Sequence, residues 1–410
     1  MIRYELKKIF GSVGGKIALG LYIATVILSC FLAANGFMNV DVKWVNEQGE
    51  SERGFHAVQM LREARNEWEG YLDQEMLTKV IQENLRINAT PEAQSGITKQ
   101  QEIAYGWKQG FGPIRDMINR SYSAGFRTYD YYRVDGISVI KEETFYGNRT
   151  RQLKDWLYDK TDVAYDLYTE AEKQYLIGQY EKLETPFYVD YHDGWYQLLE
   201  NAALLPMLGI LIIGYMVAGI FSNEFKWKAD TVYFSTLLGR NKATSAKIKA
   251  GLLLVTVLYW AAMLIYSFAT LGYLGFEGGN CVVQLRVWKS LYNIIFWQAW
   301  VLTLICGYIG NLFLTALTMF ISAKTKSSVI AVTTPFVIMF IPSFLQGMAD
   351  WLDTVIAMMP VGLLEFYQHL GTFDLITIFG KVFRVLPPRH AGNEVRNLFC
   401  TRSLNGNGKR

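Results

Sequence analysis

The stretch NAALLPMLGILIIGYMVAGIFSN, residues 201–223, is 23 residues long and contains no Asp, Glu, Lys or Arg. About 20 apolar residues in a helix suffice to cross the hydrocarbon core of a bilayer. Four other charge-free runs are at least as long: Ile17–Val40, Ala250–Phe276, Ser290–Ala323 and Ser327–Ala349. Soluble cores rarely contain even one such run, so the sequence predicts an integral membrane protein with several helical spans.

The connections between these runs are short and basic, whereas one long polar segment is acidic. Residues 1–16, 223–249 and 324–326 together hold 12 Lys and Arg against three Asp and Glu. Residues 41–199 hold 19 Lys and Arg against 27 Asp and Glu, a net charge of −8. Because short basic loops stay in the cytoplasm, the N-terminus and residues 223–249 are expected inside, and residues 41–199 outside.

We therefore predict an all-α, polytopic helical membrane protein with a mostly helical extracytoplasmic domain inserted between spans 1 and 2. Apolar residues recur three or four apart over residues 55–80, which is typical of an amphipathic helix, and NATP at 88–91 breaks the pattern. Further helices are expected over 99–121, 149–160 and 162–183, while 133–145 suits a short strand or a loop. The expected parts of the chain are a cytoplasmic N-terminal helix (1–16), span 1 (17–40), the extracytoplasmic domain (41–199), spans 2–5 with a cytoplasmic loop at 223–249 (200–349), a segment that either re-enters the membrane or has lost the last span (350–383), and a basic tail (384–410).

Several chemical functions are disfavoured by the sequence. The four cysteines show no CxxC or Cys–His spacing, which disfavours a metal site. GSVGGK at Gly11–Lys16 lacks the spacing and the hydroxyl residue of a phosphate-binding loop. His192 and Asp193 are adjacent, but no nucleophile accompanies them, and we interpret them as part of an interfacial loop. Asn311, deep in an apolar run, is expected to make a helix–helix hydrogen bond.

The loop that follows the opening stretch, EFKWKADTVYFSTLLGRNKATSAKIK (Glu224–Lys249), is basic and amphipathic. It is too short to be a domain but long enough for a surface helix and a connection. One interpretation is a docking element for a partner protein. The other is a basic loop that binds anionic lipid headgroups.

The span pattern and this loop resemble the permease subunit of an ABC-2-type ABC transporter. More narrowly, the chain resembles the Gram-positive permeases that carry a large extracellular domain between spans one and two. The likeness is strongest over Gly219–Gly251, where Phe221 and Glu224 close span two and Thr236, Leu237, Leu238, Arg240 and Lys247 follow. It departs at the C-terminus, where the sixth span of that family is not evident after Lys381.

The resemblance implies an exporter subunit in a bacterial cell membrane, driven by ATP hydrolysis in a separate ABC ATPase subunit. A second permease copy, or a paralogous permease, would complete the pathway, and the substrate would be peptide or drug-like. Catalytic residues, cofactors, metals and nucleic-acid partners are not expected in this chain. The residues implied in ATPase coupling are Glu224, Phe225, Trp227, Phe234, Leu237, Leu238, Arg240 and Lys247.

Two rival functions are open to a chain of this kind. A membrane receptor would use the extracytoplasmic domain to bind a ligand without transport, but the sequence offers no cytoplasmic signalling domain. An intramembrane enzyme needs ionisable residues inside its spans, and the five apolar runs contain no Asp, Glu, Lys or Arg.

Overall fold

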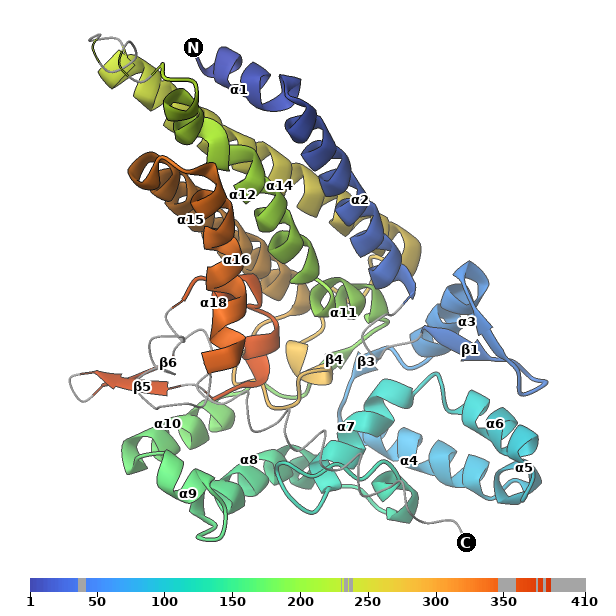
Figure 1. The fold of residues 1–410 in the computed structure, drawn as a ribbon. Coiled ribbons are helices and arrows are strands. Elements are labelled where there is room, and N and C mark those ends of the chain that lie inside the picture. Colours follow the sequence, from blue (N-terminus) through green and yellow to red (C-terminus); the bar gives the residue numbers. More distant parts are fainter. Residues whose placement is uncertain are drawn as a thin grey trace, which may run out of the picture.

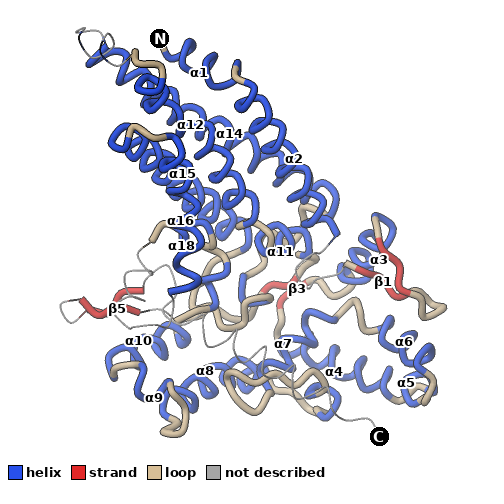
Figure 2. Tube along the Cα trace, in the orientation of Figure 1, coloured by secondary structure: helices blue, strands red, loops and turns tan. Residues whose placement is uncertain are grey.

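The computed structural model describes residues 1–35, 42–229, 231, 235, 239–345, 359–373, 375–378 and 381–384. The fold is mostly helical, at 72% of residues. A bundle of long helices occupies one part of the molecule, and a layer of shorter helices lies across one end of it (Figure 1). Loops and short strands are concentrated where the two parts meet (Figure 2).

Among the described residues, four helical segments are long and apolar enough to cross a membrane: Val13–Asn35, Asp193–Lys226, Asn241–Leu274 and Phe296–Thr325. They correspond to α2 (Val13–Asn35), α11 (Asp193–Glu200) with α12 (Leu204–Lys226), α14 (Thr244–Leu274) after the π-helical turn η2 (Gly239–Ala243), and α15 (Phe296–Thr325). These four confirm the membrane character predicted from the sequence. The fifth predicted span is represented by α16 (Ser328–Leu345), where the described residues give only a shorter apolar helix, Ser328–Pro342.

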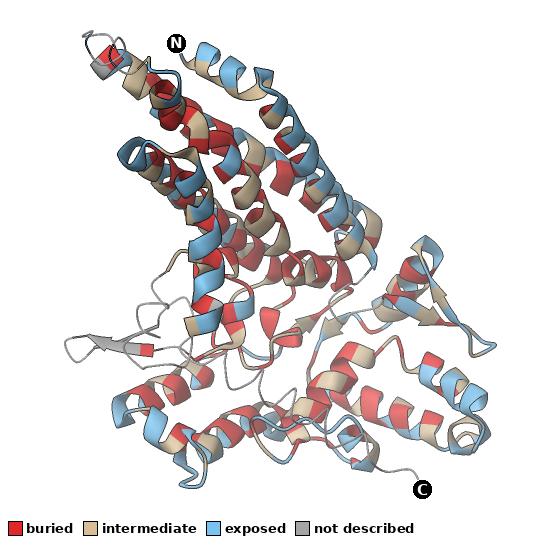
Figure 3. Ribbon diagram, viewed as in Figure 1, coloured by how far each residue is buried: buried red, intermediate tan, exposed pale blue. Residues whose placement is uncertain are grey.

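The helix α12 lies at the centre of the bundle and packs against α2, α14, α15 and α16. Its most apolar window is 61% buried, against 33% for α2 and for α14, which therefore expose apolar side chains outward. Figure 3 shows these exposed faces along the outer helices. An exposed aliphatic face on a long helix suits contact with lipid rather than water.

Polar side chains inside the bundle join neighbouring helices or bond to their own backbone. The Tyr22 hydroxyl donates to Leu258 O (3.0 Å), and the Tyr259 hydroxyl donates to Leu304 O (2.8 Å). Asn311 differs from the expectation, because its amide nitrogen donates to Gly307 O of the same helix (3.0 Å) and its Oδ1 has no partner. The predicted helix–helix hydrogen bond of Asn311 is therefore wrong.

The segment between the first two long helices is mainly helical, as its periodicity predicted. Its elements are β1 (Lys43–Val45), β2 (Ser51–Arg53), α3 (Phe55–Asn66), β3 (Gly70–Tyr71), α4 (Gln74–Asn88), α5 (Pro91–Gln94), α6 (Thr98–Trp107), α7 (Gly112–Tyr122), η1 (Arg133–Gly136), α8 (Glu142–Tyr158), α9 (Ala164–Leu167), α10 (Glu170–Glu181) and β4 (Tyr188–Val189). The pairs β1–β2 and β3–β4 are antiparallel. These short strands were not predicted, and residues 133–145 contain no strand.

The continuous apolar stripe over residues 55–80 is divided between two helices. After α3 ends at Asn66, Gly70 adopts a φ of +143°, a conformation that favours glycine, and pairs with Val189. The Asp73 side chain then caps α4 by accepting from Met76 N (3.0 Å). Both helices bury their share of the stripe, so the spacing alone could not reveal the break.

The core of this segment is completed by residues from outside 41–199. Trp288, in the connection between α14 and α15 that contains η3 (Val283–Leu285), packs 5.9 Å from Phe145, centroid to centroid. Leu291 and Phe373 join a buried cluster with Phe126, Leu153, Leu157, Leu176 and Tyr180. The Tyr180 hydroxyl also donates to Lys289 O (2.8 Å). The predicted boundary at residue 199 therefore does not separate two independent cores.

A buried arginine lies at this contact. The Arg149 guanidinium stands over the rings of Tyr180, Phe187 and Trp288, at 5.1, 5.4 and 5.1 Å. Within the described part of the chain, its Nε and Nη1 have no hydrogen-bond partner, and burial lowers the pKa of Arg149 to about 10. Cation–π contact with three rings takes the place of an ion pair here.

The C-terminal part consists of short elements: α18 (Val361–Leu364), η4 (Gln368–Gly371), and the antiparallel hairpin of β5 (Leu375–Ile378) and β6 (Lys381–Arg384). Leu364 packs among Ile210, Leu314 and Met339 of three bundle helices. Gln368 then donates to Glu200 O (3.2 Å), near the start of α12. Among described residues 359–384, no helix is long enough to cross a membrane, and residues 346–358 and 385–410 lie outside the described part.

Candidate functional site

The end of the bundle farther from residues 42–199 carries α1 (Ile2–Gly11), the end of α12, η2 and the start of α14 (Figure 1). We call it the basic end. Four charged residues meet there. Lys247 Nζ lies 2.8 Å from Glu224 Oε1 and 3.1 Å from Glu5 Oε2, and Lys8 Nζ lies 3.4 Å from Glu224 Oε1 and 3.2 Å from Glu5 Oε1. The charges alternate in sign, so each carboxylate faces both ammonium groups.

Local structure explains why these side chains converge. The helix α12 continues past the apolar run to Lys226, so Glu224 stays on the helix, one turn after Ile220. Lys247 lies in the first turn of α14 and donates to both Glu224 Oε1 (2.8 Å) and Ile220 O (2.7 Å). The helix α1 packs against both α12 and α14, which brings Glu5 to the same point. Three separate elements are therefore tied together by one ion cluster.

Burial differs strongly between the two cations. Lys247 has 2% of its side chain exposed, whereas Lys8 has 51%. Although partial burial lowers the pKa of Lys8, the hydrogen bond and charge of Glu5, with the charge of Glu224, raise it above its ordinary value. Lys8 is therefore expected to be charged at neutral pH.

The structure places only part of the sequence-predicted coupling set. Glu224 and Lys247 are brought together but turn inward, with 8% and 1% of each residue exposed. Trp227 is 62% exposed directly after α12, and the half-buried ring of Phe225 lies 4.8 Å from Lys326 Nζ. Phe234, Leu237 and Leu238 lie outside the described residues, as does the side chain of Arg240.

Glu5 and Lys8 belong to the cluster but were not predicted as site residues. The sequence did show a basic amphipathic start with a single acid among its cations. It could not show that this acid pairs with a lysine 242 positions later. Pairing across that distance depends on the packing of α1 against α14.

A second polar cluster lies at the opposite end of the bundle, where α11 begins. Asp193 forms ion pairs with Arg65 and with Arg286 (2.5 Å to the latter). Arg286 Nε donates to His192 Nε2 (3.0 Å), and His192 Nδ1 lies 2.7 Å from Asp190 O. His192 is fully buried and stacks on Phe296 at 5.5 Å. The pair forms a buried joint between α3, α11 and the α14–α15 connection, and its place at the membrane–water interface stays a prediction.

The polar groups of this joint have a structural role. Because Nε2 accepts a hydrogen bond, the proton lies on Nδ1, which donates to the carbonyl of Asp190. Burial, reinforced by the charge of Arg286, lowers the pKa of His192 to about 3. The ring is therefore neutral, with both nitrogens engaged, and neither is available as a general base.

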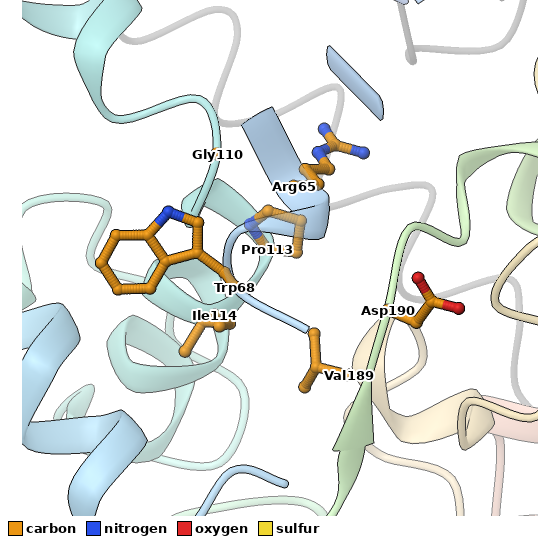
Figure 4. Close-up of a pocket in the computed structure, with 7 residues that line it drawn as sticks. All are labelled: Arg65, Trp68, Gly110, Pro113, Ile114, Val189 and Asp190. Carbon is orange, nitrogen blue, oxygen red and sulfur yellow. The ribbon is translucent and has the colours of Figure 1, made fainter. Parts of the chain in front are cut away.

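A small cavity lies beside this joint (Figure 4). Its volume is about 10 Å³, far below the roughly 300–1,000 Å³ usual for small-molecule sites. Most of its lining is apolar, with one cation and one carboxylate at the edge: Arg65, Trp68, Gly110, Pro113, Ile114, Val189 and Asp190. Among the described residues, no group of three or more His, Cys, Asp or Glu could hold a metal ion.

Comparisons with protein-family models, with curated proteins and with solved structures gave no match. Classification therefore rests on the chain itself. Four described helices are long and apolar enough to cross a membrane, and they support a helical membrane protein.

Proposed function

We propose that the chain is the membrane-spanning permease subunit of an ABC-type exporter, in which a separate ATPase docks at the basic end and drives efflux of a peptide or drug-like substrate. The basic end lies in the cytoplasm, and residues 42–199 lie outside. The net charge of −8 on the long segment and the basic short connections support this orientation. A second permease copy completes the pathway in the bilayer of a bacterial cell.

The observation that carries the proposal is the ion cluster of Glu5, Lys8, Glu224 and Lys247. It joins a surface helix to the ends of two apolar helices through contacts of 2.8–3.4 Å. A partner that displaces any of these elements would pull on the others, because separating buried paired charges is costly. This connection supports transmission of a movement from the surface into α12 and α14.

Trp227 is the contact that we propose for the ATPase. It is 62% exposed and directly follows the helix that carries Glu224. Tryptophan is enriched among the residues that dominate the binding energy of protein interfaces. Glu224 and Lys247 then link the helices behind this contact and do not themselves contact the ATPase.

The experiment is detergent purification of the chain together with the product of the adjacent reading frame. A retained ATPase supports the proposal, and Trp227→Asp should reduce its retention at least tenfold. Trp107→Asp is the matched control, because Trp107 is 42% exposed in the segment assigned to the outside. Failure of any ATPase to co-purify, with transport unaffected by Leu237→Asp and Leu238→Asp, would reject the coupling role and favour a receptor.

A further inference from the structure

Three of the long apolar helices carry an exposed lysine at the basic end: Lys16 on α2, Lys249 on α14 and Lys324 on α15. They are separate from the buried ion cluster. They also lie outside the loop portion that we assign to the ATPase contact. Their positions at helix ends raise the question of what anionic group they meet.

Each lysine lies on the same helix face as exposed apolar side chains. Residues 4, 7, 8 or 11 positions apart project from one side of a helix. The apolar partners are 44–64% exposed: Ile23 and Ile27 for Lys16, Leu253 and Val257 for Lys249, and Phe320 and Phe313 for Lys324. Each lysine therefore lies at the end of a helix face that suits contact with hydrocarbon, at the level where the lipid headgroups begin.

The described residues around the three lysines are mostly cationic. The two described acids of residues 1–16, 222–229, 239–249 and 323–328 are Glu5 and Glu224, and both turn inward to Lys247. Leu6, Ile9 and Phe10 of α1 pack on the protein, which leaves the basic side of α1 outward. Within the described residues, no exposed carboxylate competes for an anion at this end.

We propose that Lys16, Lys249 and Lys324 bind the phosphates of anionic lipid headgroups in the leaflet at the basic end. A lysine stem extends along apolar surface while its ammonium reaches the headgroups, and an anionic leaflet attracts basic residues at the end of a span. A protein partner fits less well, because it would have to cover apolar faces that continue into the bilayer. The binding is electrostatic, since the apolar side of α1 is already packed on the protein.

The test uses the purified chain in nanodiscs of phosphatidylcholine with a small fraction of spin-labelled phosphatidylglycerol or spin-labelled phosphatidylcholine. Association of the anionic label should exceed that of the zwitterionic label at least about fivefold, the factor expected for one basic residue near the surface. It should fall in 1 M salt, where the Debye length is about 3 Å. K16Q/K249Q/K324Q should abolish the preference.

Two further variants test whether the preference depends on the charge of the lysines and on their position. K16R/K249R/K324R keeps the charge and should keep the preference, which shows that the sites tolerate substitution. K99Q/K141Q/K160Q removes three exposed lysines of the opposite segment and should change nothing. An unchanged preference in the glutamine triple variant overturns the proposal. The proposal is also overturned if this variant loses ATPase retention while the lipid preference stays intact, because the surface would then bind a protein.

Discussion

Lys247 Nζ lies 2.8 Å from Glu224 Oε1, although only 2% of the Lys247 side chain and 11% of the Glu224 side chain are exposed. The two residues belong to different helices, and the partner of Lys247 on the other side is Glu5 of a third. A buried ion pair adds little stability compared with well-packed apolar residues, but removal of one partner is costly. Because removal of one partner is costly, single substitutions can test whether the cluster forms.

Lys247→Met should destabilise the protein by about 3–5 kcal/mol, because it removes the buried cation and leaves Glu5 and Glu224 paired with the half-exposed Lys8. Glu224→Gln combined with Lys247→Met should recover part of that loss. Thermal unfolding in detergent, followed by intrinsic fluorescence, measures both. Lys249→Met is the control, since Lys249 is exposed and its loss should stay within about 0.5 kcal/mol. Equal losses for the two lysines would contradict the burial of Lys247.

The stability of the protein should fall as the pH drops below 6.5, through His192. Its pKa is lowered by burial, and by Arg286, to about 3, so the unfolded chain binds a proton in this range that the folded chain does not. Each pH unit between about 6.5 and 3 then costs about 1.4 kcal/mol, or about 2 kcal/mol between pH 7 and pH 5. His192→Gln preserves a donor and an acceptor but cannot titrate, so its unfolding temperature should depend less on pH. Identical pH profiles for the two proteins would exclude His192 as the cause.

Arg149 and Trp288 should respond in opposite ways to substitution. Arg149→Met removes a buried charge that has no ion pair, while keeping most of the volume, so the free energy of unfolding should change by less than about 1 kcal/mol or increase. Trp288→Ala should cost about 3–5 kcal/mol because it opens a cavity beside Phe145. Chemical denaturation of the two variants gives the comparison. A larger loss for Arg149→Met than for Trp288→Ala would show that the guanidinium has a polar partner.

Residues 42–200 should not form a stable domain when expressed alone. Trp288, Leu291 and Phe373 cover part of its apolar core, and their absence would expose that surface to water. We expect aggregation in size-exclusion chromatography and strong binding of a hydrophobic dye. A fusion that adds residues 276–295 through a flexible linker should reduce both effects. A monomeric, dye-negative fragment 42–200 would show that the core closes without these residues.

The sequence predicted the long helices well because their signal is local. Twenty consecutive apolar residues have few alternatives to a membrane helix, so four of the five runs were recovered as helices whose ends differ from the predicted ones by two to nine residues. The helical periodicity of residues 55–80 was also correct as to type. It failed at Glu67–Asp73, where a glycine and a strand pair depend on residues 188–189, more than 100 positions later.

The site was less predictable because it depends on packing. Glu224 and Lys247 were chosen from a resemblance, yet the reason they meet is the packing of α12 against α14, which no local pattern encodes. His192 and Asp193 show the same limit. The sequence indicated no partner for either side chain, whereas Arg65 and Arg286 pair with Asp193 in the interior and Arg286 also donates to His192.

The shared core of the outer segment has a consequence for biogenesis. Residues 42–199 leave the ribosome well before Trp288, Leu291 and Phe373, which fill positions in the same clusters. If the segment is secreted as proposed, its core stays incomplete on the far side of the membrane until α12 and α14 have been inserted, which brings Trp288 and Leu291, and until α15 and α16 have followed, which brings Phe373. During that interval it depends on chaperones and is open to proteases, so the order of translocation governs the yield of the folded protein.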